Sequence, residues 1–188
     1  MHILVLHNKI EGNATAADSD VLVQAEAFSG ALRLAGHTVD SMPVTLNLDA
    51  LRQSVLSAGV DLAVNLVESL GGHDRLAPLA PTLLDVLGCP YTGAPASALS
   101  LLSDKVLAKD RLSGSGLPTP DWCIGGHCYP EAEDGNPRSF PTAYIVKPRY
   151  DHASCGIDSS AIVSASSPND IDIAIADRQQ RLGRACFA

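Results

Sequence analysis

Residues 87–120, LGCPYTGAPASALSLLSDKVLAKDRLSGSGLPTP, separate two parts of the chain that have different patterns. A short strand and turn, CPYTG, is followed by a helical pattern over 95–115 with Asp104 and Lys105 inside it. The Gly-Leu-Pro sequence at 116–118 then ends the helix, because glycine and proline interrupt helical structure. We therefore expect a first domain over 1–94, a connecting helical segment over 95–116 and a second domain over 117–188.

Before this stretch, strand-like and helical patterns alternate. Strands are expected at 2–7, 39–44 and 61–67, and helices at 20–35, 49–58 and 76–87. This alternation predicts a mostly parallel sheet covered by helices. Ligands of such sheets bind beyond the carboxyl ends of the strands, which places the loops 8–19 and 68–74 at the ligand side. The fingerprint GxGxxG is missing after the first strand, which argues against a nicotinamide dehydrogenase.

Composition narrows the classes of partner. The chain has 188 residues, enough for one large domain or two small ones. A net charge of −8 disfavours a nucleic-acid or anionic-membrane surface, and any phosphate ligand would need local cations. We find no charged-then-apolar N-terminal signal, and no apolar run near the ~20 residues that span a membrane. We expect a soluble, cytoplasmic protein with no nucleic-acid or membrane partner.

The five cysteines form an odd set without the spacing of a disulfide framework, which is typical of a reducing compartment. Cys123 and Cys128, with His127 between them, have the side-chain types of a zinc site. However, no second cysteine or histidine pair follows to complete four ligands. We therefore expect Cys123 and Cys128 to be loop residues that bind no metal.

The second part contains AYIVKPRYDHASCGIDSSAIV, residues 143–163. A strand pattern over 144–146 delivers Lys147, and Pro148 then excludes a helix. The small residues that follow, before an apolar pattern resumes at Ile157, predict a hairpin. One cation beside a small-residue tip suits a phosphate group, which needs a charge and convergent backbone donors. A surface hairpin with an incidental lysine explains these residues equally well.

The last part of the chain has a helical pattern over 168–182, begun by a proline and ended by Gly183. The final four residues, ACFA, start an apolar strand. We expect that the chain is cut through a structural element here, and that the second domain is looser than the first. The alternative is a complete edge strand.

Four stretches resemble the ATP-grasp superfamily, with most similarity to D-alanine–D-alanine ligase and related carboxylate–amine ligases. In chain order they are VNLVESLGGHDR (64–75), residues 87–120, YIVKPRYDHASCGI (144–157) and RLGRACFA (181–188). The resemblance implies an α/β fold. Its first part would be a Rossmann-like, parallel-sheet pre-ATP-grasp domain, followed by the first, smaller α+β subdomain of an ATP-grasp domain, truncated.

The same resemblance implies an ATP-dependent ligase. ATP would phosphorylate a carboxylate, and an amine would attack the acyl phosphate to form an amide or peptide bond. Small amino acid-like carboxylate and amine substrates, and a homodimer, would follow from the family. The alternatives are a non-catalytic ATP-grasp remnant that binds a nucleotide or peptide, and an unrelated two-domain α/β protein.

The resemblance also assigns nucleotide-binding residues. Lys147 and Lys105 fall on family lysines that contact the nucleotide phosphates. Ser154, Cys155 and Gly156 fall in the loop that folds over those phosphates. From spacing alone, Lys105 is better explained as an ordinary solvated helix lysine.

Substrate residues are expected in the loops after the first and third strands, with Glu11, Glu68 and His73 as candidates. Both loops depart from the family pattern, so the carboxylate and the amine stay unspecified. The family binds Mg²⁺ through Asp, Glu and Asn of a later lobe. We therefore expect the metal ligands beyond residue 188 and no turnover by this chain alone.

Overall fold

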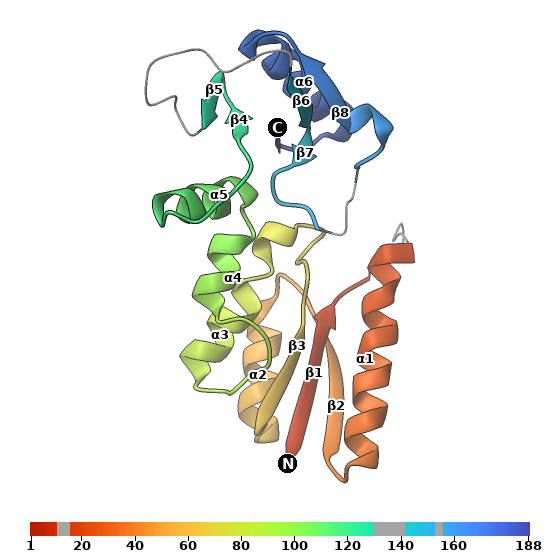
Figure 1. Cartoon of the computed structure of the whole chain (residues 1–188). Helices are drawn as coiled ribbons and strands as arrows, with labels where there is room; N and C mark the ends of the chain where they lie inside the picture. The colour runs from red at the N-terminus through yellow and green to blue at the C-terminus, as the bar shows by residue number, and fades with distance from the viewer. Residues whose placement is uncertain (11–15, 130–141, 153–155) are drawn as a thin grey trace. The chain divides into compact units, whose positions relative to one another are not determined.

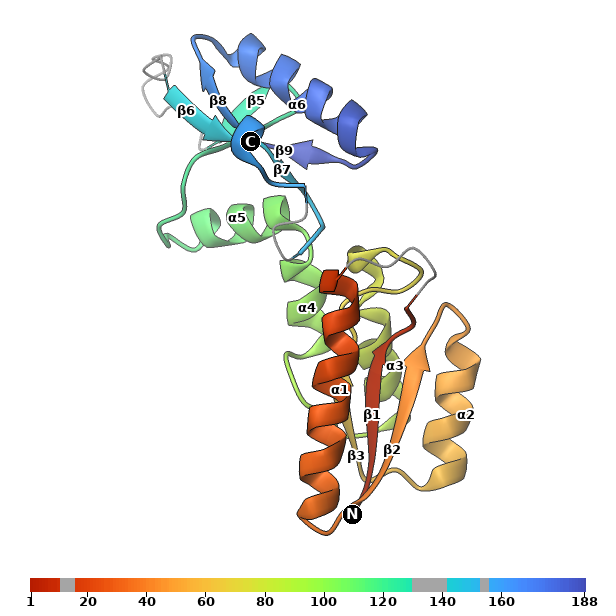
Figure 2. The ribbon, with the colours of Figure 1, turned by 90° about the vertical axis from the view of Figure 1, so that its right-hand side faces the viewer.

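The computed structural model describes residues 1–10, 16–129, 142–152 and 156–188. The chain divides into two compact units, Met1–Leu101 and Leu102–Ala188. Figures 1 and 2 show the elements of each unit, which are described separately below. The division falls within the helical segment expected to connect two domains.

The first unit is built on a three-stranded parallel sheet with β1 (His2–Asn8) between β2 (Thr38–Val44) and β3 (Leu62–Leu66). In Figure 1, α1 (Ala16–Leu34) lies on one side of this sheet, and α2 (Leu48–Ala58) and α3 (Leu79–Leu87) lie on the other. Successive side chains of a strand point to opposite faces. The predicted parallel sheet with helices on both faces is therefore confirmed.

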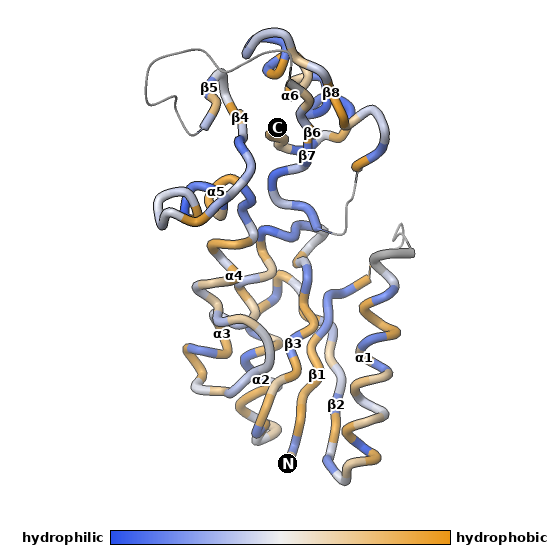
Figure 3. The backbone as a smooth tube through the Cα atoms, in the orientation of Figure 1, coloured by the Kyte–Doolittle hydropathy of each residue, from blue (hydrophilic) through white to orange (hydrophobic). Residues whose placement is uncertain are grey.

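Both faces of β1 are buried. Ile3 and Val5 pack with Ala25 of α1, whereas Leu4 and Leu6 pack with Leu51 and Leu84 of the opposite helices. A strand buried on both faces has a continuous apolar run, as HILVLH shows. Figure 3 shows β1 and β3 in hydrophobic colours and β2, an edge strand, in mixed colours.

Helix boundaries differ from the sequence prediction in three main places. Helix α3 begins at Leu79 rather than at residue 76, after a short 3₁₀ helix over Asp74–Leu76. Helix α1 begins at Ala16 rather than near residue 20. The helical pattern over 95–115 is two helices, α4 (Ala96–Leu102) and α5 (Lys105–Gly114). Asp104 is extended between them, and its side chain accepts hydrogen bonds from the amides of Val106 and Leu107 at 3.0 and 3.3 Å. This N-cap starts a new helix where a continuous one was predicted.

The second unit contains short antiparallel strand pairs on one long helix. β6 (Thr142–Ile145) pairs with β8 (Ile162–Ala165), β7 (Lys147–Pro148) with β9 (Cys186–Phe187), and β4 (Trp122–Ile124) with β5 (His127–Tyr129). Helix α6 (Pro168–Leu182) buries Ile171 and Ile175 against Tyr144 and Val146. The predicted hairpin and the predicted helix over 168–182 are both confirmed.

The expectation that Cys123 and Cys128 are loop residues is wrong. They lie opposite each other on β4 and β5 and form a disulfide. The Gly125–Gly126 turn reverses the chain between them, which brings two cysteines only five residues apart into direct register. Cys89 and Cys186 are buried and reduced.

Among the described residues, no helix combines the length and the apolar character needed to cross a bilayer.

The hydrogen bonds of His2, at the amino end of β1, predict that the stability of the first unit depends on pH. The His2 ring contacts the Ala58 carbonyl oxygen and Asp40 Oδ2, each at 2.8 Å. These two hydrogen bonds raise the pKa of His2 above 6.5. The stability that they give is therefore complete below about pH 6.5 and is lost as the pH rises through the folded-state pKa.

We expect His2→Gln to lower the urea midpoint of the first unit at pH 5.5 and to have a smaller effect at pH 8.5. Circular dichroism of unfolding at both pH values measures this difference. His37→Gln is the control, since no described residue forms a hydrogen bond with the His37 ring. An equal His2→Gln effect at both pH values would contradict the prediction.

Candidate functional site

The second unit contains a cavity of about 350 Å³ with two lysines in its lining. Lys109 comes from α5, and Lys147 stands where β7 begins. Asp121 is a third charged member, and Tyr144, Phe187 and Ala188 supply apolar walls. A cavity with an apolar wall and a few charged groups is the usual form of a small-molecule site.

Strand pairing fixes Lys147 in this cavity. Lys147 lies opposite Phe187 in the β7–β9 pair. The preceding residue, Val146, is buried, and its amide donates to the Ala161 carbonyl at 2.8 Å. Because side chains alternate along an extended chain, burial of Val146 turns the Lys147 side chain toward the opposite face. The sequence candidate Lys147 is thus half-buried on a rigid element.

Lys105 has a different position. It is the first residue of α5, and its ammonium donates to the carbonyl oxygens of Pro148 and Asp151. Lys105 is not among the described residues that line the 350 Å³ cavity. It is half-buried against the segment that follows β7, so the interpretation as a solvated helix lysine is wrong.

A buried ion pair joins the start of α5 to the same segment. Asp104 Oδ1 and Oδ2 accept from Arg149 Nε and Nη2 at 2.7 and 2.6 Å. Burial favours the neutral Asp104 carboxyl, but the hydrogen bonds from Arg149 and from two backbone amides outweigh it. The pKa of Asp104 therefore lies below its ordinary value of 3.8. This bidentate geometry is the strong form of an arginine–carboxylate contact.

Gly156 is the last of the three residues, 154–156, that the sequence assigned to a phosphate-binding loop. Its φ is +66°, a conformation that strains any residue with a Cβ, and a Cβ there would lie 3.0 Å from Leu182 Cδ1, so the leucine side chain would have to shift. The buried Arg178 side chain of α6 donates to the Gly156 carbonyl oxygen and to Ser160 Oγ. Ser154 and Cys155 lie outside the described residues.

Sequence reasoning missed Lys109. Its Nζ donates to the Pro120 carbonyl at 2.7 Å and to Thr119 Oγ1 at 3.3 Å, and lies 5.5 Å from the centre of the Trp122 ring. Burial, and then the charge of Lys147, lower the pKa of Lys109 below 10.5. One signal was present: Lys105 and Lys109 are four residues apart, which places them on one face of a helix.

In the first unit, Asn8 and Glu68 come together at the carboxyl ends of the parallel strands. The Glu68 amide donates to Asn8 Oδ1 at 3.4 Å, and the Glu68 side chain is exposed. His73 is exposed in the turn that closes the same loop, where its backbone pairs with Leu70. The structure therefore does not bring the Glu68 and His73 side chains into contact with each other. The third candidate, Glu11, lies outside the described residues.

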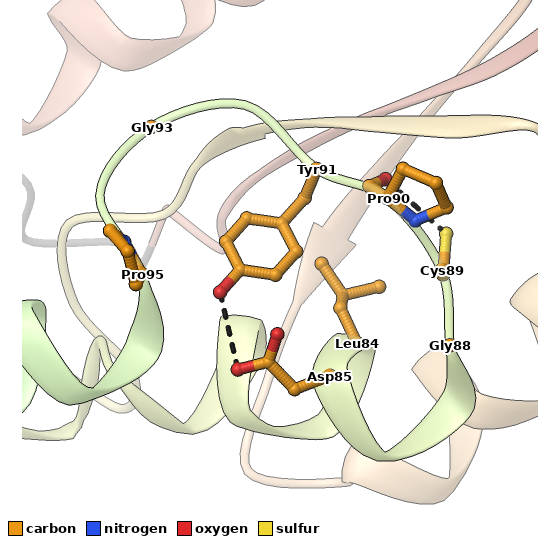
Figure 4. Close-up of a pocket in the computed structure, with 8 residues that line it drawn as sticks. All are labelled: Leu84, Asp85, Gly88, Cys89, Pro90, Tyr91, Gly93 and Pro95. Carbon is orange, nitrogen blue, oxygen red and sulfur yellow. Dashed lines mark hydrogen bonds between the residues drawn. The ribbon is translucent and has the colours of Figure 1, made fainter.

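A second cavity, of about 430 Å³, lies in the first unit between the end of α3 and the turn that follows it. Figure 4 shows the Tyr91 hydroxyl directed at Asp85, to which it donates at 3.2 Å. The same hydroxyl accepts from the Ala96 amide at 3.0 Å. No lysine, arginine or histidine is among the described lining residues, so this cavity suits an anion less well than the first.

The described residues offer no binding site for Mg²⁺. They contain no group of three or more His, Cys, Asp or Glu side chains that could hold a metal ion.

No protein-family model matches the chain. Curated relatives named D-alanine–D-alanine ligase do match. The one from Synechococcus sp. strain JA-2-3B'a(2-13) is 29% identical over 84% of this chain and 46% of its own length. The one from Alcanivorax borkumensis is 32% identical over 79% of this chain and 43% of its own length. The chain therefore spans about half the length of these relatives.

Solved structures agree in fold. D-alanine–D-alanine ligase from Bacillus anthracis matches with a TM-score of 0.63 and 16% identity, over 100% of this chain and 56% of that one. The same ligase complexed with ATP matches with a TM-score of 0.62 and 15% identity, over 100% and 57%. The resemblance to D-alanine–D-alanine ligases and the predicted fold class are confirmed.

Proposed function

We propose that this chain supplies the nucleotide-binding region of an ATP-dependent carboxylate–amine ligase similar to D-alanine–D-alanine ligase. The observation that carries the proposal is the cavity of the second unit, where Lys147 meets the apolar side chains of Tyr144 and Phe187. A cation beside apolar walls suits a phosphorylated ligand with a flat ring. Support also comes from relatives of that name and from the ATP complex of a structurally similar ligase.

The reaction that we propose joins two small amino acid-like substrates. A carboxylate takes the terminal phosphoryl group of ATP, and the amine of the second substrate then attacks the acyl carbon. An amide bond forms, and inorganic phosphate leaves. Lys147 would stabilise the negative charge of the phosphates. Glu68 is our candidate for a substrate contact, since it follows β3 at the end of the sheet where ligands bind.

Lys105 and Gly156 have supporting roles in this proposal. Lys105 would act on the phosphates partly by fixing the segment after β7, because its ammonium donates to two carbonyl groups there. Gly156, held by Arg178, fixes the other end of the loop. Lys105 and Gly156 thus fix the described residues on either side of 153–155, the residues whose backbone N–H groups we propose contact the phosphate oxygens.

We expect Lys147→Ala to weaken ATP binding by about tenfold or more, or roughly 1.4 kcal/mol, because a half-buried cation facing the phosphates is lost. Isothermal titration of the 188-residue chain with ATP and Mg²⁺ measures this. Arg111→Ala removes an exposed cation of the second unit that is not among the described residues lining the cavity, and is the control. Absence of ATP binding by the unsubstituted chain, or equal affinity of the Lys147→Ala variant, would contradict the proposal.

A further inference from the structure

Three of the chain's four lysines lie on α5 or at the start of β7, although the chain carries a net charge of −8. Lys105 contacts backbone carbonyl groups outside the described cavity lining, whereas Lys109 and Lys147 both line the cavity. Lys109 and Lys147 repel each other, and Asp121, the third charged residue of the lining, offsets only part of this repulsion. An anion placed between them would convert the repulsion into attraction.

The hydrogen bonds of Lys109 leave capacity for a ligand. An ammonium group has three N–H donors. Among the described residues, two acceptors are near Lys109 Nζ, the Pro120 carbonyl oxygen and Thr119 Oγ1. These two contacts and the packing near Trp122 restrict the rotamers of the long side chain. Lys109 therefore holds one N–H donor in a fixed position, with little entropy left to lose on binding.

We propose that Lys109 is a second anion-binding residue of this cavity, which acts with Lys147 on the phosphate chain of the nucleotide. The inference rests on the nucleotide-binding role proposed above for the Lys147 cavity. Lys109 also fixes the segment between α5 and β4 through Pro120, so the purely structural alternative is that it does only this. The two roles differ in whether the charge of residue 109 matters or only its ability to donate hydrogen bonds.

Two substitutions separate charge from hydrogen bonding. Lys109→Gln keeps N–H donors but removes the charge, and Lys109→Arg keeps the charge. Arg111→Met removes an exposed cation from the same helix and is the control. Trp122 is the only tryptophan, and its ring lies 5.5 Å from Lys109 Nζ, so its fluorescence reports binding at this point. The probes are ATP and inorganic tripolyphosphate, which lacks the base and sugar, each with the full chain.

We expect Lys109→Gln to weaken binding of both probes by about tenfold, equivalent to roughly 1.4 kcal/mol. The Lys109→Arg and Arg111→Met variants should bind both probes with nearly the affinity of the unsubstituted chain. Equal ATP affinity of the unsubstituted chain and Lys109→Gln would overturn the inference and leave the proposed function intact. Tripolyphosphate binding that depends on Lys109, without ATP binding, would support the anion-binding role of Lys109 and overturn its role, and that of the cavity, in nucleotide binding. Binding of neither probe would overturn both.

Discussion

Asp104→Ala should destabilise the second unit by about 3 kcal/mol, since it removes an N-cap and one partner of a buried ion pair together. Loss of an aspartate N-cap costs about 1 kcal/mol. Breaking a fully buried pair costs about 3–5 kcal/mol, and we expect a smaller contribution here because the Arg149 side chain is 26% exposed and can be partly rehydrated. Denaturant unfolding followed by Trp122 fluorescence isolates this unit, because the tryptophan is buried within it.

A control and a double variant test the assignment. Asp110→Ala removes an exposed carboxylate from the same helix and should change the unfolding free energy by less than about 0.5 kcal/mol. The double variant, Asp104→Ala with Arg149→Met, should lose less unfolding free energy than the two single variants lose together, because it leaves no unpaired charge. Strict additivity of the two substitutions would show that the ion pair contributes nothing.

Acid should weaken the same ion pair. The folded-state pKa of Asp104 lies below its ordinary value of 3.8, so the contribution of the ionised carboxylate is complete above that pH. As the pH falls through the folded-state pKa, the contribution is lost. The stability gap between the unsubstituted chain and Asp104→Ala should therefore narrow at low pH.

The sheet of the first unit could be predicted because its signals are local. Residues 3–6, ILVL, are all apolar, and a strand with such a run is buried on both faces. Glycines after the helices over 49–58 and 79–87 also mark ends that the structure has. Asp104 was harder to interpret, since no glycine or proline separates α4 from α5. Its side chain also pairs with Arg149, which is 45 residues away and therefore invisible to any local pattern.

The candidate site was predictable only in part, because some of its features depend on contacts between residues that are far apart in the sequence. Lys147 follows a strand directly, so its place at the strand end can be inferred from its neighbours in sequence. Lys105 and Lys109 lie on one face of α5, so which of them reaches the cavity depends on the position of the helix along its axis and on the carbonyl groups that bind Lys105. Tertiary contacts set that position, and the sequence pattern of a helix without buried residues carries little information about it. The disulfide was missed because a five-residue separation has no framework signature.

Ile171→Ala is expected to destabilise the second unit by about 2–5 kcal/mol, because a fully buried branched side chain leaves a cavity that its neighbours fill only partly. Ile171 packs in one cluster with Tyr144 and Val146, the strand residues that lead to Lys147. The substitution therefore removes support from beneath the candidate site as well as from the core. Trp122 fluorescence during urea unfolding gives the stability of this unit.

The chain offers a matched control two residues away. Ile173 is on the same helix but is 61% exposed, so Ile173→Ala deletes the same atoms and should cost less than about 0.5 kcal/mol. A large difference between the two variants requires a second unit with its own packed core in this chain. Equal effects would instead indicate a loosely packed unit, in which Lys109 and Lys147 lack the rigid support that the proposed nucleotide site needs.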